Sequence, residues 1–206
     1  MDSAEQPQIY LISPPVFDLD QFPDLLARVL DSTPVACVRM AMAGRDEDRI
    51  ARAADALRAV THARDIALVI DDHVLLAQRL GLDGVHLGDA AKSVRAARKT
   101  LGSDAIVGSF CGASRHDGLT AGEAGADYIS FGPVGPGALG DGKVADLDLF
   151  QWWSEVIEVP VVAEGCLTPD IVRTFAPCTD FFGIGDEIWQ ADDPAVALAQ
   201  LVAAMA

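Results

Sequence analysis

Two adjacent carboxylates, Asp71 and Asp72, directly follow the continuous apolar run from Ala67 to Ile70. An apolar run of this kind is typical of a strand that is buried on both faces, as in a parallel sheet. Parallel α/β folds keep their chemistry at the carboxyl ends of their strands. We therefore expect the pair to lie in a site, where it could share a proton or hold a cation. The alternative for Asp72 is an N-cap of the helix that follows.

Other charged side chains follow apolar runs elsewhere in the chain. Arg39 would either bind an anion or pair with Asp71 or Glu164 across the same face. His86, inside a short apolar run, is either packed and hydrogen-bonded or catalytic. Six carboxylates would together form an acidic mouth suited to a cationic ligand or a metal, unless several of them cap helices. They are Asp71, Asp72, Asp89, Glu164, Asp186 and Glu187.

Eight apolar segments alternate with helical patterns, and these segments must position the charged residues. Val74 to Leu80, for example, has helical spacing and ends at Gly81, and Asp46 and Thr168 are expected helix caps. Eight strands without a glycine-rich switch-point motif favour an α/β fold of the (β/α)8 TIM barrel type, as a single domain over residues 1–206. The expected strands are Gln8–Ser13, Val35–Met40, Ile66–Ile70, Gly84–Leu87, Ala105–Phe110, Asp127–Phe131, Val159–Ala163 and Asp180–Ile184.

Composition excludes several classes of protein. The 206 residues are half hydrophobic and carry a net charge of −16, which argues against nucleic-acid binding. No apolar run is long enough for a membrane helix, and the stretch from Met1 to Tyr10 does not resemble a secretory signal, so a cytoplasmic protein is expected. Cys37, Cys111, Cys166 and Cys178 form no CxxC pair and are expected to be buried free thiols.

Several segments, in the same order, resemble thiamine phosphate synthase and its relative, the TenI-type thiazole tautomerase. They are QIYLIS from Gln8, IDD from Ile70, LDGVHLG from Leu82, IVGS from Ile106, GADYI from Gly125, GPVGP from Gly132 and PVVA from Pro160. The resemblance implies a barrel of thiamine biosynthesis that joins a hydroxymethylpyrimidine diphosphate to a thiazole phosphate. In this family Mg²⁺ and basic side chains stabilise the departing diphosphate.

The resemblance also implies roles for individual residues. Asp72 would hold Mg²⁺, with Asp71 or Asp89 assisting, and Arg39 and Lys143 would face the diphosphate. A small-molecule ligand would lie at the C-terminal face of the barrel, and a homodimer is expected by resemblance alone. The substrate-binding surface would include His86, Phe110, Glu164, Gly165, Cys166, Gly185 and Asp186.

The chain departs from the family pattern at several of these positions. Ala43 and Ala91 stand where the family has a lysine and a second metal carboxylate, and Asp186 stands where it has a serine facing phosphate. Like charges about 4 Å apart repel strongly in a desolvated site. We therefore expect the condensation to be lost or altered. The alternatives are a non-catalytic barrel that binds a small molecule or a partner, an active synthase that uses Asp72 and relocated basic residues, and a TenI-like tautomerase.

Overall fold

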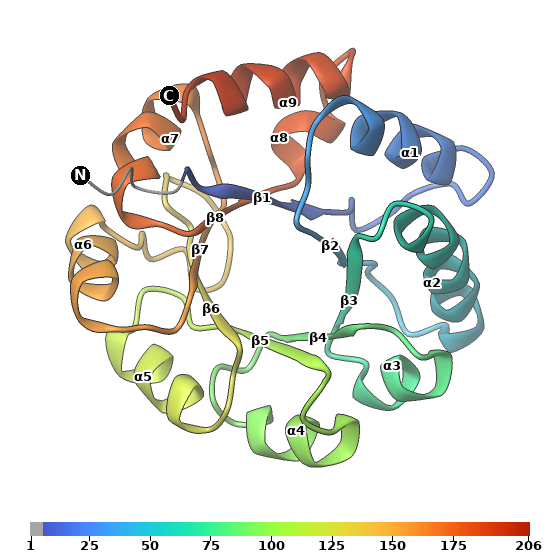
Figure 1. The fold of residues 1–206 in the computed structure, drawn as a ribbon, viewed down its shortest axis with the longest axis horizontal. Helices are drawn as coiled ribbons and strands as arrows, with labels where there is room; N and C mark the ends of the chain where they lie inside the picture. Colours follow the sequence, from blue (N-terminus) through green and yellow to red (C-terminus); the bar gives the residue numbers. More distant parts are fainter. Residues whose placement is uncertain (1–5) are drawn as a thin grey trace.

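Eight parallel strands close into a barrel in chain order, and helices surround it (Figure 1). The computed structural model describes residues 6–206, so part of the N-terminal stretch considered for a signal lies outside the described residues. The expected single-domain (β/α)8 barrel is confirmed. The strands are β1 (Gln8–Ile12), β2 (Cys37–Met40), β3 (Ala67–Asp71), β4 (Gly84–Leu87), β5 (Ile106–Phe110), β6 (Tyr128–Phe131), β7 (Val161–Glu164) and β8 (Phe181–Ile184).

The helices lie between consecutive strands and after the last one. The longer helices are α1 (Phe22–Ser32), α2 (Glu47–His62), α3 (Val74–Leu80), α4 (Val94–Leu101), α5 (Arg115–Glu123), α6 (Leu147–Val156), α7 (Pro169–Phe175) and α9 (Pro194–Ala203). Each strand and helical segment expected from the sequence is present, with ends displaced by up to three residues. Two short elements were not predicted, the 3-10 turn η1 (Ala176–Cys178) and the helix α8 (Asp186–Trp189), because a single turn has no detectable periodicity.

Local sequence explains where several helices begin and end. The expected caps are confirmed: the side chain of Asp46 accepts a hydrogen bond from the amide of Arg49, and that of Thr168 accepts one from Ile171. Gly81 ends α3 in the left-handed conformation, with φ of 63°, which glycine adopts without steric cost. These signals fix the lengths of the helices that return the chain to the start of each next strand.

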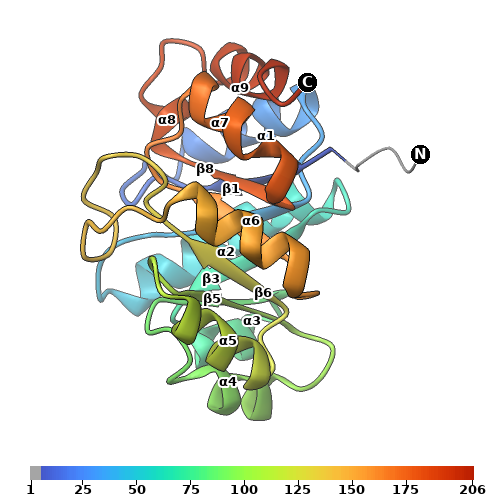
Figure 2. The ribbon, with the colours of Figure 1, turned by 90° about the vertical axis from the view of Figure 1, so that its left-hand side faces the viewer.

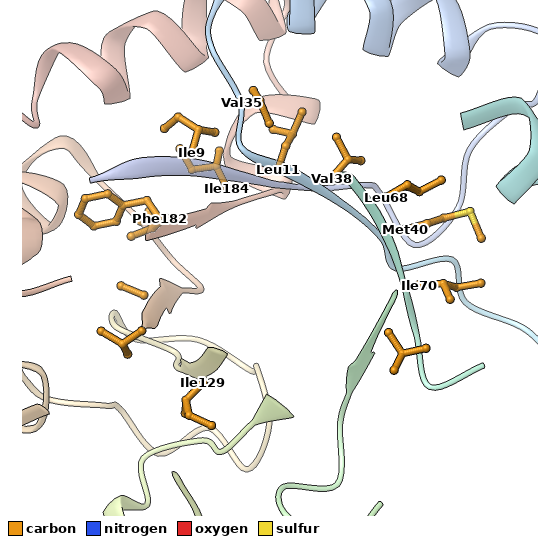
Figure 3. Packing of buried hydrophobic residues seen from close by; sticks show 14 of the residues in the cluster. Ile9, Leu11, Val35, Val38, Met40, Leu68, Ile70, Ile129, Phe182 and Ile184 are labelled. Atoms are coloured by element: carbon orange, nitrogen blue, oxygen red, sulfur yellow. The ribbon is translucent and has the colours of Figure 1, made fainter. Parts of the chain in front are cut away.

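The hydrophobic core has two layers. The outer layer lies between strands and helices, and Ile9, Val38 and Leu68 point from the strands into it (Figure 3). A smaller cluster fills the N-terminal half of the barrel interior and consists of Tyr10, Cys37, Val69, Tyr128 and Val162. Side chains alternate along a strand, so the positions next to outward-facing residues point into the barrel.

Gly108 makes room for this inner cluster. A Cβ atom at Gly108 would lie 1.9 Å from Cζ of Tyr128, so the tyrosine ring crosses the barrel only because β5 carries no side chain there. At the other end of the barrel, the loop from 132 to 146 projects on the side opposite the N-terminus (Figure 2). The strands therefore hold a packed lower interior beneath an open face lined by loops.

Candidate functional site

A buried polar network fills the C-terminal half of the barrel interior, with Arg39 at its centre. Arg39 Nη2 donates to Glu164 Oε2 at 3.1 Å, and Nη1 donates to Glu164 Oε1 at 3.4 Å. Arg39 Nε lies 3.3 Å from Asp71 Oδ1. Ser130 Oγ donates to Glu164 Oε1, so this carboxylate is held by two strands. The sequence-level alternative of an ion pair for Arg39 is therefore confirmed, and it involves both carboxylates.

Hydrogen bonding fixes the tautomer of His86. Arg39 Nη1 lies 2.9 Å from His86 Nε2, and because a guanidinium only donates, Nε2 must be the acceptor. The proton then resides on Nδ1, which donates to the hydroxyl of Tyr128 at 2.8 Å. Burial, and to a lesser extent the charge of Arg39, lowers the pKa of His86 well below its ordinary value, so the ring is neutral at pH 7.

Two tyrosines continue this chain of hydrogen bonds into the lower interior. The hydroxyl oxygens of Tyr10 and Tyr128 are 2.5 Å apart. Burial is the main reason that the pKa of each hydroxyl is raised well above its ordinary value. The network thus runs from carboxylates at the open face, through Arg39 and His86, to two protonated phenols. The network holds the Arg39 guanidinium rigidly and fixes which ring nitrogen of His86 carries the proton. His86 is therefore packed and hydrogen-bonded, which confirms that alternative.

Asp71 has a pKa close to neutrality. Its pKa is raised to about 6, mainly by burial, with Arg39 opposing the rise and with Glu164 and Asp72 adding to it. Asp71 Oδ1 and Arg39 Nε are close but are not aligned for a hydrogen bond, and both atoms are buried without another partner among residues 6–206. About a third of the Asp71 side chain remains exposed. Asp71 can therefore change charge without rearrangement of the barrel.

Asp72 has a different role from the helix cap that was considered. The residue before α3 is His73, and the side chain of Asp72 instead accepts a hydrogen bond from the amide of Gly88 at 2.8 Å. Its φ of 56° is left-handed, which is uncommon outside glycine and marks a constrained position. Asp72 thereby ties the loop after β3 to the loop after β4, and its carboxylate is exposed at the open face.

Within residues 6–206, the C-terminal face opens into a rim cavity, an inner cavity and a lysine cavity. The rim cavity, of about 550 Å³, lies over β1, β2, β7 and β8 and is lined by Arg39, Glu164, Gly165, Cys166, Gly185, Asp186 and Glu187, among others. The inner cavity, of about 140 Å³, is lined by Arg39, Asp71, Asp72, His86, Gly88, Phe110, Leu139 and Glu164. The lysine cavity, of about 480 Å³, includes Asp89, Lys92, Phe110, Asp117, Asp141 and Lys143.

The predicted acidic mouth is divided among these cavities. Glu164, Asp186 and Glu187 share the rim cavity, as expected. Glu164 is neutralised by Arg39, whereas Glu187 accepts hydrogen bonds from the backbone amides of Leu167 at 3.1 Å and Gly185 at 2.8 Å. Asp89 lies apart in the lysine cavity, where its Oδ2 accepts from Ser93 Oγ.

Arg39 and Lys143, both expected to face the diphosphate, line different cavities: Lys143 lines the lysine cavity, whereas Arg39 lines the other two. One sequence prediction needs correction. Cys166 is not a buried thiol: it is exposed at the rim with a left-handed φ of 61°, because the loop after β7 turns sharply there. The other three cysteines are buried as expected.

Sequence reasoning missed four polar contributors, Tyr10, Tyr128, Ser130 and Lys92. Tyr10 and Tyr128 occupy alternate positions in strands that read as apolar, and Ser130 stands two residues after Tyr128 on the same face. Strand alternation relative to His86 was the signal that could have found them. Lys92 is one of only three lysines in the chain, and two of the three, Lys92 and Lys143, line one cavity.

The sequence also matches a known family model. Residues 9–179 match the model described as thiamine monophosphate synthase. This match covers most of the chain. The chain belongs to the thiamine monophosphate synthase family.

Individual relatives agree with this assignment. The chain is 40% identical to a thiamine-phosphate synthase of Rhodospirillum centenum over 195 residues, which cover 93% of this chain and 94% of the relative. It is also 40% identical to one of Erythrobacter litoralis over 208 residues, with 96% of each chain covered. A thiamine phosphate pyrophosphorylase structure from Pyrococcus furiosus shares the fold, with a TM-score of 0.83, 24% identity, and coverage of 96% of this chain and 95% of that one. The expected place in thiamine biosynthesis is therefore supported by sequence and fold together.

Family membership raises the question of whether these residues fit Mg²⁺. Among residues 6–206, no group of three or more His, Cys, Asp or Glu side chains is placed to hold a metal ion. Asp89 Oδ1, however, is buried without a hydrogen-bond partner in that range, and the exposed Asp72 accepts a hydrogen bond from the amide of Gly88, the residue before Asp89. Mg²⁺ commonly binds through one or two carboxylates together with substrate phosphates. These residues therefore fit a Mg²⁺ ion that is also held by a diphosphate rather than one enclosed by protein alone.

The helices give one further finding. Within the described part of the chain, none is both long enough and apolar enough to cross a membrane.

Proposed function

We propose that this chain catalyses the condensation of a hydroxymethylpyrimidine diphosphate with a thiazole through an altered site. The proposal rests on one observation above all: a charged network around Arg39, built from the ends of five strands, lies at the open face of a barrel of this family. The named relatives at 40% identity support the reaction class. The departures that the resemblance implies, such as Ala43 in place of a lysine and Asp186 in place of a serine, are the reason for proposing an altered site.

The inner cavity has the charge that this reaction requires on the pyrimidine side. Asp71, Asp72 and Glu164 face a single guanidinium there, so the carboxylates outnumber the cation. As diphosphate leaves, positive charge develops on the pyrimidine, and fixed carboxylates stabilise such charge without reorganising. Arg39 holds Glu164 and Asp71 in position and thereby acts as a positioning residue rather than as the diphosphate contact expected from sequence.

The lysine cavity is the better place for the leaving diphosphate. Lys92 and Lys143 line it from two different loops, and both are free of ion pairs within residues 6–206. Asp72 and Asp89 would hold Mg²⁺, which when bound neutralises charge on the departing diphosphate. Lys92 and Lys143 then supply the remaining positive charge, so the basic residues lost elsewhere are relocated to this side of the face.

A steady-state assay with the pyrimidine diphosphate, Mg²⁺ and the thiazole, either as its phosphate ester or as its free alcohol, tests the proposal. We expect condensed product by chromatography and mass detection, and a loss of kcat/KM of about ten-fold or more for Lys92→Ala or Lys143→Ala, because each removes a charge-assisted contact to diphosphate. Lys99→Ala is the matched control, since Lys99 lies exposed on α4 outside the cavity and loses the same charge.

A second candidate is a barrel that binds a thiazole or pyrimidine without condensing them. The observation in its favour is that both terminal nitrogens of Arg39 are engaged by protein partners, His86 and Glu164. If calorimetry detects ligand binding while neither form of the thiazole yields product, this second function replaces the first. Product formation that is equally sensitive to Lys99→Ala and Lys92→Ala would contradict the assignment of the lysine cavity.

A further inference from the structure

The carboxylate of Glu187 lies where two backbone amides converge. Its two carboxylate oxygens accept hydrogen bonds from the amide of Leu167, in the loop after β7, and from the amide of Gly185, directly after β8. These two amides, here called the amide pair, come from two different loops and converge on one carboxylate. In (β/α)8 barrels the loops after strands seven and eight, with a short extra helix, frequently form a phosphate site. Here that short helix is α8, and it carries the carboxylate itself.

The surroundings give a phosphate no compensating attraction. Glu187 and Asp186 both line the rim cavity, and Glu164 beneath them is already paired with Arg39. A phosphate at the amide pair would have to displace Glu187 and then lie beside two or three carboxylates. Like charges at such distances repel strongly where water is excluded. Among residues 6–206, Arg39 is the one cation that lines the rim cavity, and both of its terminal nitrogens are engaged by His86 and Glu164.

A hydroxyl group meets the opposite conditions. Glu187 retains acceptor capacity on its carboxylate after binding two amides, since an ionised carboxylate has about four lone-pair sites. An alcohol can donate to it without disturbing the amide pair. We infer that Glu187 is a specificity-determining residue, which excludes a phosphate ester from the rim cavity and selects the thiazole as its free alcohol. This inference rests on the proposed condensation and names its second substrate.

The condensation itself balances for either form of the thiazole. The bond between the pyrimidine methylene carbon and the diphosphate oxygen breaks, and its electron pair leaves with diphosphate. The lone pair of the thiazole nitrogen forms the new bond to that carbon, and the nitrogen becomes positively charged. The hydroxyethyl oxygen takes no part, so the choice between alcohol and ester depends on binding at the rim cavity alone.

Phosphate binding provides a test that does not need catalysis. Inorganic phosphate is titrated by calorimetry into the wild-type protein and into the variants Glu187→Ala, Glu187→Gln and Asp186→Ala. We expect Glu187→Ala to bind phosphate at least about ten-fold more tightly than either the wild type or Asp186→Ala, because only Glu187→Ala frees two amides for a charge-assisted bond, whereas any binding at the lysine cavity is common to all these proteins. Asp186→Ala is the matched control: it removes the same charge from the same cavity, and the side chain of Asp186 holds neither amide. Glu187→Gln keeps one acceptor for the amides and guards against a folding defect in the alanine variant.

Kinetics provide the second test. We expect the wild type to prefer the alcohol over the ester in kcat/KM, and Glu187→Ala to shift that ratio toward the ester by at least about ten-fold, whereas Asp186→Ala shifts it less. Efficient wild-type turnover of the ester would overturn the inference and leave the condensation standing. No turnover of either form would overturn the proposed function, and the phosphate titration would still decide the role of Glu187. Equal phosphate affinity in the wild type and Glu187→Ala would overturn that role.

Discussion

Replacement of Arg39 by methionine should destabilise the barrel far more than the loss of an ordinary surface charge. The side chains of Arg39 and Glu164 are only 8% and 2% exposed. Arg39→Met keeps the apolar length of the side chain but leaves Glu164 buried with Ser130 as its hydrogen-bond partner. Removing one partner of a buried ion pair lowers the free energy of unfolding by about 3–5 kcal/mol, because the charge that remains is buried and uncompensated.

The double variant Arg39→Met/Glu164→Gln tests whether the uncompensated charge of Glu164 causes the loss of stability. Glutamine retains an acceptor for Ser130 and removes the uncompensated charge, so the double variant should recover at least about 2 kcal/mol of the single variant's loss. The measurement is urea denaturation followed by both circular dichroism and tryptophan fluorescence, since coincident curves are needed before free energies are compared. A loss below about 1 kcal/mol for Arg39→Met, or strictly additive effects in the double variant, would refute the view that Arg39 is fixed by buried charge.

Three further changes test other parts of the network. The pKa of Asp71 is raised to about 6, so the folded state holds this proton more tightly than the unfolded chain does. The stability of the wild type relative to Asp71→Asn should therefore fall as the pH rises from about 4 to about 6. Urea denaturation at several pH values in that window measures the change, and a rise in relative stability would contradict the prediction. Tyr128→Phe removes the acceptor for the Nδ1 proton of His86 and should cost about 1–3 kcal/mol in unfolding free energy, whereas an unchanged denaturation midpoint would argue against a stabilising hydrogen bond between His86 and Tyr128. Gly108→Ala places a Cβ 1.9 Å from the ring of Tyr128 and should cost about 1–3 kcal/mol, most of it restored when Tyr128 is also replaced by leucine; no restoration would locate the strain elsewhere.

The open face was foreseen from sequence because its signals are local. Asp71 and Asp72 were placed at the end of a strand by the apolar run before them, and the end of β3 lies there. His86, inside a short apolar run, was expected to be either packed and hydrogen-bonded or catalytic, and it is buried. The order of the motifs identified the family before any contact was known.

Pairing across the barrel could not be foreseen in the same way. Arg39 and Glu164 are 125 positions apart, and either could have faced a ligand until the barrel closed and placed them in contact. Glu187 was expected either to face a cavity or to cap a helix, and its carboxylate lines the rim cavity while it binds the amides of its own loop and of the loop after β7. The partner of Arg39 and the contacts of Glu187 both depend on which charged groups the folded barrel removes from water, and burial is known only once the interior is assembled.

The sequence by itself determined the eight-fold alternation, most helix ends and the family, because hydrophobic periodicity and capping act over a few neighbouring residues. Tertiary structure alone decided how the charges are shared. In the folded barrel, Arg39 contacts Glu164, Asp71 and His86. Lys92 and Lys143 line one cavity, and Glu187 binds the amide pair. Closure of the barrel brings distant strand ends within a few ångströms in a partly desolvated space, where each buried charge must find its partner.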